Sequence, residues 1–185
     1  MSSSYKPDVI VFMTDEERAT PSYEAPEVLE WRDKALTGRN WFRDNGVSFN
    51  RHYTGSLACV PSRPTLFTGQ FPDVHGVTQT DGLGKDAYDS RMRWLTSREV
   101  PTLGHWFRAA GYDTHYDGKW HISHADLIDE STGQPLATNT SDGTIIQDAV
   151  ERYLEINPLN EYGFSGWVGP EPHGGLLGNS GIIRD

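Results

Sequence analysis

The sequence predicts an α/β fold, and three observations support that fold class. Residues 9–13 (VIVFM) form a short apolar run rich in β-branched side chains, which is typical of a strand buried on both faces. Residues 102–111 combine a capping threonine, apolar residues and a final glycine, which indicates a helix. Residues 112–116 (YDTHY) follow as a further short strand. Strand and helix therefore alternate along the chain.

The segment after the first predicted strand is expected to be helical. Apolar residues recur at near-helical spacing between residues 23 and 46, with an interruption at Gly38 and a natural stop at Gly46. We therefore expect one helix or a broken pair of helices. Apolar and polar residues then alternate over residues 46–53, which predicts a second strand.

Two more helices are predicted outside this region. Residues 62–69 begin after a proline and stop at a glycine, which fits a short helix with Cys59 at its entrance. A further helix is expected over residues 144–156. Residues 163–181 contain seven of the chain's 19 glycines, a density that suits an active-site loop.

Composition narrows the class of protein. The chain has 185 residues, of which 36% are hydrophobic and 23% charged, so we expect one domain with a packed core. A net charge of −10 with no block of Lys and Arg argues against a nucleic-acid partner. No apolar run approaches the roughly 20 residues of a membrane span, and no signal-peptide pattern begins the chain, so a cytoplasmic protein without a membrane partner is expected.

Acidic residues follow the first predicted strand directly. Asp15, Glu16 and Glu17 stand at its carboxyl end, which is where ligands bind in open α/β sheets. Carboxylates are also the ligands that hard divalent cations prefer. A solvated strand end explains the same residues equally well.

The only cysteine has an unusual setting. Cys59 stands at a predicted helix entrance, and Arg63 follows one turn later. Helix N-termini and guanidinium groups both stabilise anions. Taken alone, the pentapeptide is explained equally well by a buried cysteine beside a solvated arginine.

Three segments together resemble the sulfatase family. Residues 59–69 (CVPSRPTLFTG) resemble the signature around the cysteine that is converted to formylglycine. Residues 111–121 (GYDTHYDGKWH) resemble the second signature, and residues 8–16 resemble the first strand with its metal-binding acids. Their order and spacing also match, and the resemblance runs from residue 8 to about residue 180.

The resemblance implies an alkaline-phosphatase-like sandwich with a mixed, mostly parallel central sheet. Members of the family are usually much longer than this chain. Residues 1–185 are therefore expected to be the N-terminal part of a single sulfatase catalytic domain, truncated at the C-terminus, with an incomplete sheet.

The resemblance also implies a nucleophile and a metal. Asp15 and Glu16, together with Cys59 in its formylglycine form, would bind a divalent cation, commonly calcium in this family. The hydrated formylglycine would attack the sulfur of a small-molecule sulfate ester, and the alcohol would leave. A formylglycine-generating enzyme is the implied partner for maturation.

Four more residues take roles by resemblance. Lys119 would offset charge on the sulfate oxygens, and His121 would be the base whose proton removal expels sulfate. Arg63 would hold the hydrated formylglycine and the metal in place. His173, in the segment 166–175, would help to protonate the leaving alcohol. The five other histidines are expected to be structural or exposed.

Two departures leave alternatives open. Glu16 stands where many sulfatases have aspartate, and the family's second pair of metal ligands normally follows a longer stretch of chain than residues 1–185 provide. We therefore expect this chain alone to bind metal weakly and to lack turnover. One alternative is a phosphonate or phosphodiester hydrolase of the same superfamily. The other is a catalytically incomplete fragment or binding module, in which Cys59 is never oxidised and a partner completes the sheet.

Overall fold

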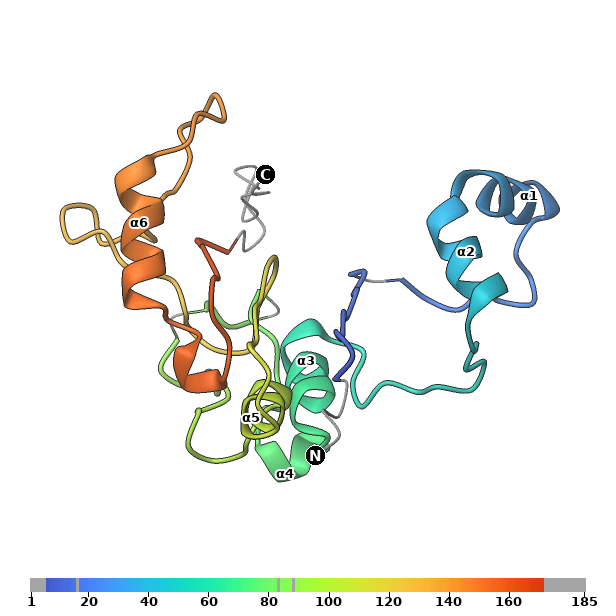
Figure 1. Cartoon of the computed structure of the whole chain (residues 1–185), viewed down its shortest axis with the longest axis horizontal. Helices are drawn as coiled ribbons and strands as arrows, with labels where there is room; N and C mark the ends of the chain where they lie inside the picture. The colour runs from blue at the N-terminus through green and yellow to red at the C-terminus, as the bar shows by residue number, and fades with distance from the viewer. Residues whose placement is uncertain (1–5, 16, 83, 88, 172–185) are drawn as a thin grey trace. The chain divides into compact units, whose positions relative to one another are not determined.

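The computed structural model describes residues 6–15, 17–82, 84–87 and 89–171. The chain divides into two compact units, Met1–Tyr53 and Thr54–Asp185. Figure 1 labels the helices of both units.

The first unit contains two short helices that contact each other, α1 (Pro26–Ala35) and α2 (Thr37–Asn45). The predicted broken helix pair is confirmed, although the break falls at Leu36 rather than at Gly38. Leu36 has φ −92° and ψ 57°, outside the helical region, so it caps both helices. Gly46 ends α2, as the sequence predicts.

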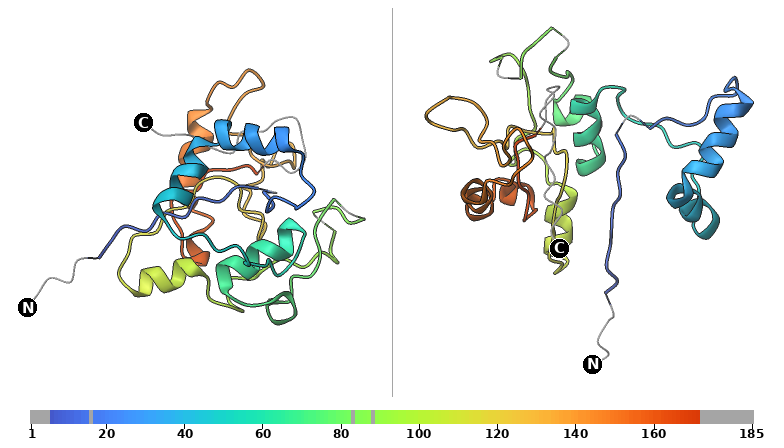
Figure 2. Two further views of the ribbon diagram at one scale, coloured as in Figure 1. Left: turned by 90° about the vertical axis from the view of Figure 1, so that its right-hand side faces the viewer. Right: turned by 90° about the horizontal axis from the view of Figure 1, so that it is seen from above.

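The segment 9–13, predicted as a strand, is extended but unpaired among the described residues. Figure 2 shows residues 6–15 as an extended segment, and no described segment pairs with it. The exposed fraction of its apolar residues ranges from 39% at Met13 to 79% at Phe12, so this segment is not buried on both faces. A strand requires a backbone partner, and none is described here. The segment 46–53, also predicted as a strand, is likewise unpaired among the described residues.

The second unit holds the remaining described helices. These are α3 (Cys59–Thr68), α4 (Pro72–His75), α5 (Leu103–Ala109), α6 (Gln147–Ile156) and the 3₁₀ helix η1 (Asn160–Tyr162). The three helices predicted in this region are confirmed as α3, α5 and α6, and α3 packs against α4 and α5 (Figure 1). Among the described residues, every helix is too short or too polar to cross a membrane.

The expected mostly parallel sheet is absent from the described residues. Their only β-pairing consists of isolated bridges. Where a strand was predicted over 112–116, His115 and Ser165 form one parallel bridge. The Tyr116 N–H donates to the Ser165 carbonyl at 3.0 Å, and the Ser165 N–H donates to the Thr114 carbonyl at 3.0 Å. The prediction of parallel pairing is thus met by a single bridge, because no further partner extends the ladder among these residues.

An aromatic cluster forms the centre of the second unit. Phe67 of α3 contacts Tyr116, Trp120 and Phe164, with ring centroids 5.8, 5.5 and 5.8 Å apart. Trp120 is fully buried and also packs edge-on against Tyr162 at 5.3 Å. Buried aromatic rings contribute large contact areas to a core. The cluster therefore holds α3 against the segment that carries Trp120.

Candidate active site

Cys59 is the first residue of α3 and is partly exposed. The loop before it is tied to the helix, because the Thr54 and Ser62 hydroxyl oxygens lie 2.8 Å apart. The loop also passes so close to the helix that a Cβ on Gly55 would lie 2.8 Å from the Thr65 methyl group. Only glycine fits there without a shift of the Thr65 side chain.

Arg63 joins the two signature segments. It lies four residues after Cys59, so both residues share one face of α3. Arg63 is 6% exposed, and its Nη1 donates to the Lys119 carbonyl and, at 3.4 Å, to the Trp120 carbonyl. A buried guanidinium requires such acceptors. The nucleophile helix and the segment with Lys119 are thereby held together.

The segment around Lys119 has a defined backbone shape. The Tyr116 hydroxyl donates to the Lys119 carbonyl at 2.5 Å, and burial raises the pKa of Tyr116 to about 12, so this donor stays protonated at neutral pH. Gly118 has φ +84°, a left-handed conformation that favours glycine. Its carbonyl accepts a hydrogen bond from the Trp167 indole at 2.9 Å.

His121 is held by two carboxyl groups that the sequence analysis did not identify. Its Nε2 lies 2.9 Å from Asp81 Oδ1, and its backbone N–H donates to Glu171 Oε2 at 2.8 Å. His121 has φ +50°, which is uncommon for a residue with a Cβ and indicates an over-determined position. Asp81 and Glu171 are 40 and 50 residues away in sequence, so no local pattern reveals either contact.

Glu171 is a buried acid in the glycine-rich segment. It is 6% exposed, and this burial raises the pKa of its carboxyl group to about 8, with a further increase from the Asp126 carboxylate. The Glu171 N–H donates to Asp126 Oδ1 at 2.9 Å. Strongly shifted acids beside candidate catalytic residues are typical of functional sites.

The predicted metal ligands are distributed over both units and one residue outside the described ranges. Asp15 belongs to the first unit and Cys59 to the second, while Glu16 lies outside the described residues. Within the described ranges, no three His, Cys, Asp or Glu side chains form a group that fits a metal ion. The metal site stays a prediction. His173 also lies outside the described residues.

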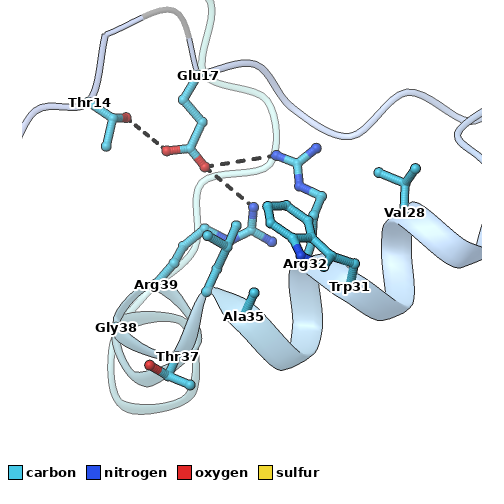
Figure 3. Close-up of a pocket in the computed structure, with 10 residues that line it drawn as sticks. Thr14, Glu17, Val28, Trp31, Arg32, Ala35, Thr37, Gly38 and Arg39 are labelled. Carbon is cyan, nitrogen blue, oxygen red and sulfur yellow. Dashed lines mark hydrogen bonds and ion pairs between the residues drawn. The ribbon is translucent and has the colours of Figure 1, made fainter.

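The acid after the predicted metal pair has a different role. Figure 3 shows Glu17 between two arginines, with its carboxylate 3.3 Å from Arg39 and 4.0 Å from Arg32. The Thr14 hydroxyl donates to Glu17 at 2.8 Å, and this bond, followed by Arg39, lowers the pKa of Glu17. Glu17 thus joins α1 to α2 at the edge of an open hollow of about 550 Å³ lined partly by Trp31.

Comparison with known proteins gives one consistent result. The family described as Sulfatase matches residues 7–164. The uncharacterized sulfatase YidJ of Escherichia coli is 37% identical over 84 residues, which is 45% of this chain and 14% of that protein. The choline-sulfatase of Rhizobium meliloti is 29% identical over 125 residues, 66% of this chain and 21% of that protein.

A mammalian relative extends the comparison. The N-acetylgalactosamine-6-sulfatase of Mus musculus is 32% identical over 83 residues, 43% of this chain and 15% of that protein. The aligned part of this chain therefore spans between 14% and 21% of the length of these three relatives. No solved structure matches the chain.

Proposed function

The chain belongs to the sulfatase family, and on that premise we propose that it carries the nucleophile-bearing part of a sulfuric ester hydrolase active site. Cys59, matured to formylglycine, is the proposed nucleophile. The observation that carries the proposal is the contact between the two signature segments. Arg63, one turn after Cys59, donates to the carbonyls of Lys119 and Trp120.

The residues of this chain have separate proposed tasks. A hydrated formylglycine supplies two hydroxyl groups, one to attack sulfur and one whose deprotonation releases sulfate. Lys119 offsets negative charge on the sulfate oxygens, and His121 accepts the proton. Arg63 keeps α3 and the Lys119 segment in register through its carbonyl contacts. His173 is proposed to protonate the alcohol as it leaves.

A divalent cation belongs to the proposal as a prediction only. Asp15 and Glu16 would be the ligands from this chain, with calcium as the cation that the family favours. Oxygen ligands from carboxylates suit calcium, which takes six to eight of them. These two residues supply too few oxygens, so other parts of a complete enzyme would provide the rest.

The same reasoning applies to the sheet. We propose that residues 9–13 pair with strands of an alkaline-phosphatase-like sheet in a complete enzyme. Two facts support this: the apolar side chains of this segment are exposed in the first unit, and the relatives compared above are several times longer than the aligned region. Each of those relatives is named a sulfatase, which favours sulfuryl over phosphoryl transfer as the reaction class.

Aldehyde labelling of the chain tests this proposal. The chain is produced together with a formylglycine-generating enzyme and treated with an aldehyde-selective hydroxylamine probe. We expect labelling of the wild-type chain and none of Cys59→Ala, because Cys59 is the only cysteine. A wild-type chain that stays unlabelled in a competent host would favour the inert fragment or binding module. Equal labelling of both chains would show that the probe does not report on residue 59.

A further inference from the structure

We propose that Asp81 is a positioning residue that fixes His121 in its Nε2-protonated tautomer. The inference deepens the proposed function and rests on it for the role of His121 as a base. The tautomer itself is a property of the folded chain, and it is measured without any turnover.

The contact has the geometry of a strong hydrogen bond. Asp81 Oδ1 lies 2.9 Å from His121 Nε2, and the two side chains are only 10% and 9% exposed. An ionised carboxylate has acceptor oxygens and no donor, so the hydrogen between these two atoms belongs to Nε2. The low exposure limits competition from water and strengthens the preference.

The rest of the ring environment keeps His121 in place. Glu171 binds the backbone N–H at 2.8 Å, and the Trp94 ring packs against the imidazole with centroids 5.8 Å apart. Glu171 contacts the main chain in this bond and so does not select a ring nitrogen. The Asp81 carboxylate, in contrast, contacts the imidazole ring itself at Nε2.

The chemical consequence concerns the other ring nitrogen. A neutral imidazole has one N–H and one basic lone pair. With the hydrogen on Nε2, the basic lone pair is on Nδ1. In the proposed function, the basic atom of His121 is therefore Nδ1, which is buried within the folded chain. Asp81 acts through His121, as the aspartate of a Ser-His-Asp triad acts through its histidine in other hydrolases.

The test is a nitrogen NMR measurement on the full chain. Histidine labelled with ¹⁵N reports the tautomer of each ring through its long-range proton correlations, and His121→Gln identifies the signals of His121. At a pH where the ring is neutral, we expect the Nε2-protonated form in roughly tenfold excess or more, which is the typical effect of one charge-assisted hydrogen bond. Asp81→Ala is expected to reduce that excess at least several-fold.

Asp113→Ala is the matched control, because it removes the carboxylate of an exposed aspartate in the same unit. It should leave the His121 signals unchanged. A wild-type His121 protonated on Nδ1, or an even mixture, would overturn the proposal even if Asp81→Ala does not fold. An unchanged tautomer in a folded Asp81→Ala chain would also overturn it. Aldehyde labelling at residue 59 does not depend on the tautomer of His121. A failure of the proposed function can therefore be distinguished from a failure of this inference.

Discussion

The buried carboxyl group of Glu171 makes folding stability depend on pH in a specific direction. Burial raises its pKa from 4.5 to about 8. Between these values the unfolded chain has lost the proton and the folded chain still holds it, so unfolding releases a proton. The stability contributed by this group is complete below pH 4.5 and is lost as the pH rises through about 8. At about 1.4 kcal/mol for each pKa unit, the upper bound of this loss is roughly 5 kcal/mol.

Urea unfolding followed by tryptophan fluorescence measures this effect at several pH values between about 5 and 8.5. Glu171→Gln keeps an acceptor for the His121 N–H but removes the titration, so we expect a much flatter dependence than in the wild type. Glu155→Gln is the control, because Glu155 is exposed on α6 and should keep the wild-type slope. The reasoning is refuted if Glu171→Gln and the wild type lose stability equally as the pH rises.

Three further outcomes are expected. Phe67→Ala should lower the free energy of unfolding by about 3–5 kcal/mol, because it removes a ring from the aromatic cluster. Leu66→Ala, at a side chain that is 50% exposed, should change it by no more than about 0.5 kcal/mol, and equal effects would contradict the described core. Burial lowers the pKa of His75 below 6.5, so stability should fall as the pH drops below that value, and thermal melts of His75→Gln should lack this contribution. The isolated chain with calcium should not hydrolyse an aryl sulfate or a phosphodiester above background. Asp15, Glu16 and residue 59 offer too few oxygens to bind the cation. Rapid hydrolysis of either substrate would contradict this expectation.

Local signals predicted the helices well. Gly46 and Gly69 end α2 and α3 where the sequence indicated, and α5 starts after Thr102 as expected. These features depend on residues within one or two turns, so they can be read from a short window. The strands were predicted less well, because a strand such as residues 9–13 is defined by a partner elsewhere and none is described.

In the candidate site too, local features were predicted from the sequence and tertiary contacts were not. The motif identified Cys59, and the structure adds that Arg63 binds the segment of Lys119. No local pattern indicated Asp81 or Glu171, because each reaches His121 through tertiary contacts. The predicted roles of Asp15, Glu16 and His173 stay predictions, since they depend on contacts outside the described residues or between the two units.

Mass spectrometry of residue 59 tests the central claim most directly. Trypsin should release residues 52–85 as one peptide, because Arg63 is followed by proline. After production with a formylglycine-generating enzyme, we expect this peptide to be lighter by the mass difference between a thiol-bearing and an aldehyde-bearing side chain. A peptide that carries only the unmodified thiol in a competent host would contradict the account.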